Sequence, residues 1–379
     1  MPTQAQFDRY SQFLESDPQN IRLLTDTANC AHEMGHLNDV IELTSRGLQV
    51  DPGNRELRAS KALATLGLGN FTEAANLLQQ LVDDGEDAPA IRYNLAYCLA
   101  LSQQYPQALA LLEDAEAHYT ELPQMVHLKV RVLHFMAELE QAIALCQRCL
   151  QQQPQDAVLH GALSTMYIDT TEFALAKQHA ELAMQSSSPP PEAETSMGVI
   201  ALSDQDDATA LIHFEKAIAA KQNSGRAWLG KAMSLMMQQQ LPDAEQSYNS
   251  ALQYMPNHLG TWQGLAWCQI AANNLDGAEQ SLQKALEIDD TFAETHGALA
   301  VIAVLSGDTQ QARTLIRRSL GIDHESFSGL FAQALLLKQQ GKLEASQKLI
   351  NTMLDEPILP DQRTLRDSFI KHMSNNKNK

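Results

Sequence analysis

Residues 225–258 read GRAWLGKAMSLMMQQQLPDAEQSYNSALQYMPNH, and the pattern of these residues recurs every 34 residues along the chain. Trp228, Ala232 and Leu235 have the i, i+4, i+7 spacing that places side chains on one face of a helix. Ala244 and Tyr248 then lie on the buried face of a second helix. Large side chains alternate with small ones, so bulky groups have gaps to enter. The stretch therefore predicts a helical hairpin.

Two prolines mark the bounds of the second helix. Pro242 falls in its first turn, where a missing N–H has little effect on stability. Pro256 blocks continuation of the helix and ends the unit. One hairpin cannot bury both of its faces alone, so neighbouring units must stack to complete the core.

Small residues recur at fixed positions of this unit. Such columns arise where two helices approach closely and the unit is then repeated. One column, with a spacing of 34 residues, consists of Ala74, Ala108, Ala142, Ala176, Ala210, Ala244, Ala278 and Ala312. The period runs from residue 21 to residue 360 without an insertion, which predicts ten stacked hairpins.

This pattern resembles the tetratricopeptide repeat family. The family signature has a Trp-Leu-Gly-Tyr run in the first helix, Ala and an aromatic residue in the second, and a closing Pro. Besides the alanine column, the matching residues are Trp228, Trp262, Tyr167, Tyr248, Phe214, Pro52, Pro154 and Pro256. Several units depart from the signature, with Glu86, Thr120, Gln222 and Asp290 in place of the closing proline. The resemblance implies an all-α fold, a right-handed superhelical solenoid of about ten helix-turn-helix repeats with capping helices at both ends.

The ends and the middle of the array predict its organisation. Residues 1–20 read as an N-terminal capping half-repeat, residues 21–190 as repeats 1–5, and residues 191–360 as repeats 6–10. Residues 361–379 are expected to form an amphipathic capping helix followed by a disordered tail. The run SSSPPP at 186–191 lies between repeats 5 and 6, either as a stiff loop or as a boundary between two functional halves.

Composition and charge narrow the classes of partner. The net charge is −19, and residues 1–125 hold 7 Lys/Arg against 18 Asp/Glu. A basic stripe that could neutralise phosphates is missing, so nucleic-acid binding is not expected. The sequence predicts no signal peptide and no membrane span. Five cysteines without framework spacing fit a reducing compartment, and the expected location is cytoplasmic.

His32, Glu33, Met34, Gly35 and His36 match the zinc protease motif H-E-x-x-H. That chemistry requires both imidazoles on one face of a continuous helix. Gly35 falls in the turn between paired helices and should end the helix before His36 can align. A zinc metalloprotease is therefore only a remote alternative.

Cys146 and Cys149 form a C-x-x-C pair, but both occupy core positions of a second helix. No second pair completes a four-ligand zinc site, and no strand precedes the motif as a redox site requires. They are expected to be packing residues. The sequence thus predicts no catalytic residues, no metal and no cofactor.

Each first helix carries a second stripe of side chains beside its core-facing stripe. In the family that the chain resembles, this stripe lines a concave groove that holds peptide ligands. The stripe is polar and aromatic in repeats 3 and 4 and turns apolar from repeat 5 onward. The predicted groove residues are Tyr93, Tyr97, Arg131, Val199, Leu202, Leu229, Met233, Met236, Trp267, Ile270, Val301, Val304, Phe331 and Leu335.

These residues predict a non-catalytic scaffold or adaptor that binds a hydrophobic or amphipathic segment of a partner protein. Methionines can repack around varied apolar ligands, and Trp267 suits the role of an anchor. The Lys/Asn/Arg clamp of chaperone-binding relatives is missing, because repeat 2 presents Glu56, Ala59 and Leu63. A chaperone-like holdase for secretion or membrane-assembly subunits is the alternative function. Self-association through the same surface, or stacking that buries it, would also explain the stripe.

Overall fold

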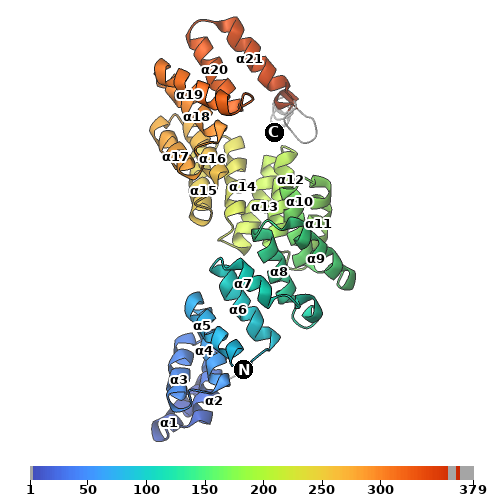
Figure 1. Ribbon diagram of the computed structural model, residues 1–379, viewed down its shortest axis with the longest axis vertical. Helices are drawn as coiled ribbons and strands as arrows, with labels where there is room; N and C mark the ends of the chain where they lie inside the picture. The colour runs from blue at the N-terminus through green and yellow to red at the C-terminus, as the bar shows by residue number, and fades with distance from the viewer. Residues whose placement is uncertain (1–2, 357–363, 368–379) are drawn as a thin grey trace. The chain divides into compact units, whose positions relative to one another are not determined.

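The computed structural model describes residues 3–356 and 364–367 of the 379-residue chain, and the regular elements in these ranges are helices (Figure 1). A single helix, α1 (Gln4–Ser16), precedes ten helix pairs. The first five pairs are α2 (Ile21–Glu33) and α3 (Leu37–Val50), α4 (Arg55–Gly67) and α5 (Phe71–Asp83), α6 (Pro89–Leu101) and α7 (Tyr105–Leu111), α8 (Pro123–Phe135) and α9 (Leu139–Gln152), and α10 (Ala157–Asp169) and α11 (Phe173–Ala183). The last five are α12 (Pro191–Ser203) and α13 (Asp207–Ala220), α14 (Gly225–Met237) and α15 (Leu241–Tyr254), α16 (Leu259–Ala271) and α17 (Leu275–Ile288), α18 (Ala293–Leu305) and α19 (Thr309–Ile322), and α20 (Phe327–Gln339) and α21 (Leu343–Asp355).

The predicted period is confirmed, since the first helix of every pair begins 34 residues after the previous one. The turn inside each pair has one residue in the left-handed region, again at this spacing. Glycine holds this position in four pairs, as at Gly35 and Gly307, while Ala137 and Thr171 are among the six exceptions. Every pair therefore closes with the same backbone turn, whether or not the residue favours it.

The predicted alanine column is fully buried from Ala74 to Ala312. Neighbouring helices come so close that a Cβ atom on Gly230 would lie 2.2 Å from the ring of Phe214. Gly198 faces the same ring, with a distance of 2.7 Å. The aromatic ring thus fills the space that two glycines leave, which explains the large-and-small alternation of the sequence.

The structure divides into two compact units, residues 1–159 and residues 160–379. This division falls inside α10, so the run at 186–191 lies within the second unit rather than at a unit boundary. Pro191 occupies the first turn of α12, as the loop interpretation of this run requires.

Repeat 3 departs from the pattern that the sequence predicts. Its second helix, α7, ends after seven residues and is followed by a short 3₁₀ helix, η1 (Ala115–His118). Arg92 forms a bidentate ion pair with Asp114 in the intervening turn, with both N–O distances at 2.9 Å. Leu112, Ala115 and Tyr119 remain buried, so the core positions survive the break.

At the N-terminus, Leu14 and Phe7 of α1 contribute to the core of the first pair, as a capping half-repeat should. At the other end, the predicted capping helix and tail fall mostly on residues 357–363 and 368–379, which lie outside the described residues.

Candidate functional site

The H-E-x-x-H motif does not form the arrangement that zinc proteases need. Helix α2 ends at Glu33, and Gly35 has a φ of 76° in the following turn. His36 then lies at the N-cap of α3, so the two imidazoles do not share one helix. Residues 3–356 and 364–367 contain no cluster of three metal-ligating side chains.

The C-x-x-C pair is buried in α9, as expected for packing residues. Burial raises the pKa of both thiols, and that of Cys149 reaches about 11. Thiols with raised pKa values are poor nucleophiles and poor metal ligands at neutral pH.

A polar network in the first unit links repeats 3, 4 and 5. The Asp156 carboxylate accepts hydrogen bonds from the Tyr119 hydroxyl at 2.8 Å and from His127 Nε2 at 2.7 Å. It also accepts the backbone N–H groups of Val158 and Leu159. Burial acts to raise the pKa of Asp156, but these hydrogen bonds outweigh it and lower the pKa to about 2. His127 therefore has a structural partner and is not free for a ligand.

In the second unit, most predicted groove residues keep part of their surface accessible. We call the nine residues that do so, listed below, the apolar surface of the second unit. Met233 is 46% exposed, while the other members are partly buried. The set consists of Val199, Leu202, Leu229, Met233, Met236, Trp267, Ile270, Phe331 and Leu335.

Val301 and Val304 require a correction, because they lie beneath this surface and not on it. They are 1% and 6% exposed and belong to the core of repeats 9 and 10. Trp267 and Phe331 pack against the same core, with their ring centroids 6.2 Å apart. Side chains of α16 and α20 thus cover the stripe of α18, and the two valines cannot contact a ligand directly.

Trp267 differs from the other two tryptophans in the state of its indole N–H. Trp228 and Trp262 donate theirs to the carbonyl oxygens of Gln222 and Pro256, at 2.9 and 2.8 Å. Among the described residues, Trp267 Nε1 has no hydrogen-bond acceptor and is not buried. It is therefore an open donor on an otherwise apolar surface.

Phe327 was missed by the prediction. It is 42% exposed and stacks on Phe331 at a centroid distance of 6.3 Å. It is the first residue of α20 and lies outside the repeat positions of the stripe, so the repeat pattern did not indicate it.

In the first unit, the structure brings Tyr93, Tyr97 and Arg131 together. The two tyrosine rings stack along α6 at 6.3 Å, and the Arg131 guanidinium lies 5.7 Å from the Tyr97 ring centroid. One turn further along α8, Phe135 is 63% exposed and stacks on Tyr105 at 5.7 Å.

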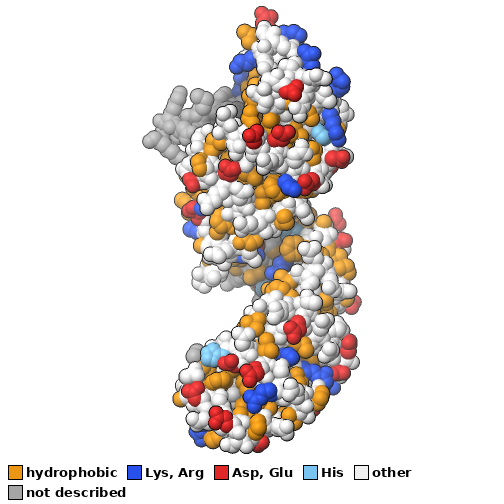
Figure 2. Space-filling view, turned by 90° about the vertical axis from the view of Figure 1, so that its left-hand side faces the viewer, with side chains coloured by type: hydrophobic (Ala, Val, Ile, Leu, Met, Phe, Trp, Pro, Cys, Tyr) orange, Lys and Arg blue, Asp and Glu red, His pale blue; other side chains and the backbone are white. Residues whose placement is uncertain are grey.

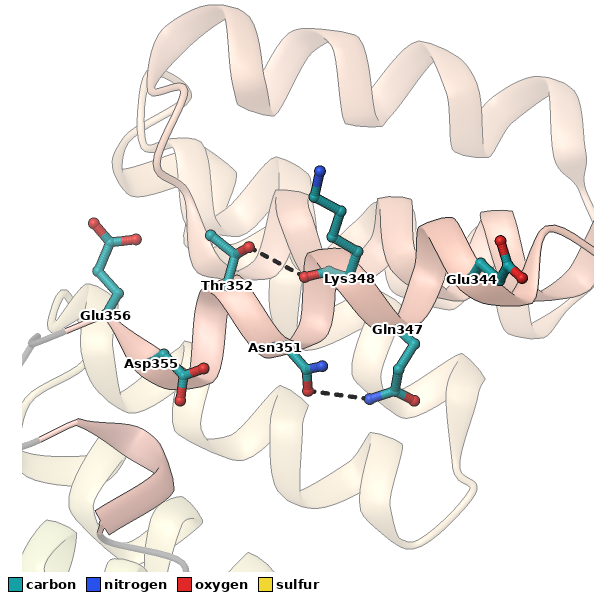
Figure 3. Close-up of a pocket in the computed structure, with 7 residues that line it drawn as sticks. All are labelled: Glu344, Gln347, Lys348, Asn351, Thr352, Asp355 and Glu356. Atoms are coloured by element: carbon teal, nitrogen blue, oxygen red, sulfur yellow. Dashed lines mark hydrogen bonds between the residues drawn. The ribbon is translucent and has the colours of Figure 1, made fainter.

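A hollow on α21 is lined by polar side chains along one side of the helix (Figure 3). Gln347 donates to Asn351 at 3.2 Å, and the Thr352 hydroxyl donates to the Lys348 carbonyl oxygen at 3.1 Å. All seven lining residues are exposed, as expected for the polar outer side of a terminal repeat.

On the face that Figure 2 displays, apolar, acidic and basic side chains are interspersed. No helix among the described residues is long and apolar enough to cross a membrane.

Sequence models described as tetratricopeptide repeat match residues 65–131, 195–258, 235–302 and 293–318, together just over half of the chain. A curated Caenorhabditis elegans protein, tetratricopeptide repeat protein 8, is 26% identical over 112 residues. That alignment spans 30% of this chain and 22% of the relative.

Two solved structures share the fold at low sequence identity. A chain of the APC/C hetero-tetramer Cut9-Hcn1 is 15% identical, with a TM-score of 0.54 over 83% of this chain and 59% of that one. A monomeric mutant of IFIT1, solved with m7Gppp-AAAA, is 13% identical, with a TM-score of 0.53 over 87% of this chain and 89% of that one. At these identities the likeness concerns the fold alone.

Proposed function

The chain belongs to the tetratricopeptide repeat family, and we propose that it is a non-catalytic scaffold that binds a hydrophobic or amphipathic segment of a partner protein. This fold in general serves protein–protein interaction. The segment would bind on the apolar surface of the second unit.

The observation that carries the proposal is the open indole N–H of Trp267 among apolar neighbours. An apolar segment would bury the exposed surface of Met233 and its neighbours, which stabilises binding by about 25 cal/mol per Å² before ordering costs. A backbone carbonyl of the same segment would accept the hydrogen bond that Trp267 offers. An aromatic anchor with one polar handle is typical of binding hot spots.

The test uses random twelve-residue peptides displayed on phage and selected on the full chain. Recovered peptides would then be labelled with fluorescein and measured by anisotropy against wild type and Met233→Glu. We expect peptides rich in apolar residues, and a loss of at least about tenfold in affinity for Met233→Glu, because a carboxylate would have to be desolvated.

Ile212→Glu is the matched control. Ile212 is 54% exposed and lies in the same unit, but on the second helix of its pair. It should bind the peptides as wild type does. Equal binding by wild type and Met233→Glu would refute the proposed surface.

A chaperone-like holdase is the second candidate, favoured by the adjoining Met233 and Met236 on α14. It predicts that the recovered peptides share no common pattern and that the chain suppresses the aggregation of unrelated heated proteins. Self-association predicts instead that the wild-type protein sediments with a mass above that of one chain, and that the mass of the Met233→Glu variant is lower.

A further inference from the structure

Arg131 is an exposed cation without an ionic partner among the described residues. Its guanidinium carbon lies 5.7 Å from the centroid of the Tyr97 ring, and among the described residues no acceptor binds its N–H groups. A guanidinium group carries five N–H donors, and contact with an aromatic ring does not use them as hydrogen bonds to an acceptor would. By contrast, Arg92 of the same region is held by Asp87 and Asp114.

The hydroxyl groups of Tyr93 and Tyr97 are also open. Neither has a hydrogen-bond partner in the described part of the chain, and neither is among its buried unsatisfied atoms. Arg131 lies close enough to Tyr93 to oppose the rise in pKa that burial of this tyrosine causes. Three side chains from α6 and α8 thus present hydrogen-bond donors to one region.

Two partly buried carboxylates of repeats 3 and 4 are not available to Arg131, because each has partners of its own. Asp114 is bound by Arg92 and His118, and Asp156 by Tyr119 and His127. The hydrogen-bond donors of Arg131, Tyr93 and Tyr97 are therefore not occupied by these two carboxylates.

Exposed apolar groups lie one helical turn further along. Leu101 follows Tyr97 by four residues on α6, and Phe135 follows Arg131 by four on α8. They are 45% and 63% exposed. A ligand that reaches the donors would also meet these two side chains.

We propose that Arg131, Tyr93 and Tyr97 bind the carboxylate of an Asp or Glu side chain that is flanked by bulky apolar residues in a partner peptide. This inference rests on the proposed function, since it assumes that first-helix surfaces of the chain hold peptides. Guanidinium groups bind carboxylates in a bidentate, charge-assisted manner, and the phenols supply further donors.

The charge of the first unit favours a carboxylate over a phosphate group. Residues 1–159 hold 10 Lys/Arg against 21 Asp/Glu. Repulsion from this excess grows with the charge of the ligand, and a phosphate monoester carries nearly twice the charge of a carboxylate.

The same phage-displayed peptides test the inference, selected in parallel on wild type and on Arg131→Gln. Wild type should recover a class of peptides with an acidic residue next to aromatic or aliphatic ones, and Arg131→Gln should lose that class. In anisotropy, replacing the acidic residue by its amide should weaken binding to wild type at least tenfold and leave binding to Arg131→Gln unchanged. Tyr97→Phe should lower the affinity for the acidic peptide several-fold.

Arg22→Gln is the control, because Arg22 is likewise exposed and without an ionic partner among the described residues. It should keep the acidic class. Recovery of peptides without acidic enrichment, or enrichment that survives in Arg131→Gln, would overturn this inference and leave the proposed function intact. A phosphoserine peptide that binds more tightly than its acidic counterpart would overturn the choice of carboxylate. Failure to recover any peptide would refute the proposed function itself.

Discussion

His160 and His179 of the second unit face each other, with their Nδ1 atoms 2.8 Å apart. One ring nitrogen must accept and the other donate, so the contact requires at least one neutral imidazole. The Tyr167 ring stacks on His179 at 5.5 Å. Burial, together with the neighbouring His160, lowers the pKa of His179 to about 4.

This geometry predicts a pH dependence of stability. The unfolded pKa of a histidine is about 6.5, so between pH 6.5 and 4 the unfolded chain binds more protons than the folded chain. The stability is fully present above pH 6.5 and is lost as the pH falls toward 4. The whole shift would correspond to about 3 kcal/mol, and because solvent screens the partly exposed side chain we expect a loss of about 2 kcal/mol. Urea unfolding followed by tryptophan fluorescence reports on the second unit, since Trp228, Trp262 and Trp267 all lie there.

His179→Gln should flatten the dependence on pH in this window. His324→Gln is the control, because the His324 side chain is 86% exposed, and it should keep the wild-type slope. An unchanged slope in His179→Gln would show that other groups cause the acid sensitivity.

Among the helix elements, the turn between α10 and α11 holds Thr171 at a φ of 61°, the left-handed conformation found in the turn of every pair. A β-branched residue is strained in this region, and glycine is not. Thr171→Gly should therefore raise the free energy of unfolding by about 0.5–1 kcal/mol, after the greater freedom of glycine in the unfolded chain is subtracted. Urea unfolding by fluorescence measures the change.

Thr314→Gly is the matched substitution at an exposed position inside α19. It should lower stability by a few tenths of a kcal/mol, because glycine is a poor helix former. A loss of stability in both variants would mean that the turn at Thr171 carries no strain.

The helix pairs could be predicted from the sequence because small residues and turns recur in a fixed frame. The break after α7 could not, since residues 105–118 are mostly good helix formers. The ion pair between Asp114 in this turn and Arg92 of α6 holds the turn, and a contact between residues 22 positions apart is not visible in a local pattern. The burial of Val301 was missed for a similar reason, because Trp267 and Phe331 cover it from two other helices.

At the scale of the whole molecule, a repeat array is stabilised by contacts between neighbours, so damage should stay local. Gly230→Ala would force a methyl group into the ring of Phe214 and weaken the packing of α13 against α14. In the Gly230→Ala variant, the backbone amides of α12 to α15 should exchange faster than in the wild type. The amides of α2 to α5 in the first unit should keep their protection.

Ala219→Gly is a suitable comparison, because Ala219 is exposed on α13 and the change adds no clash. Uniform loss of protection along the chain after Gly230→Ala would indicate that the two units unfold as one cooperative body. Exchange confined to the neighbouring repeats would support independent units.

The five cysteines offer a practical consequence. All of them are buried, and the pKa of each thiol is raised. Maleimide dyes react with exposed thiolates, so the native protein should resist labelling. If one cysteine is introduced at the surface of each unit, the dyes should attach to these two positions alone. Energy transfer between the two dyes could then follow the binding of a partner peptide in single molecules.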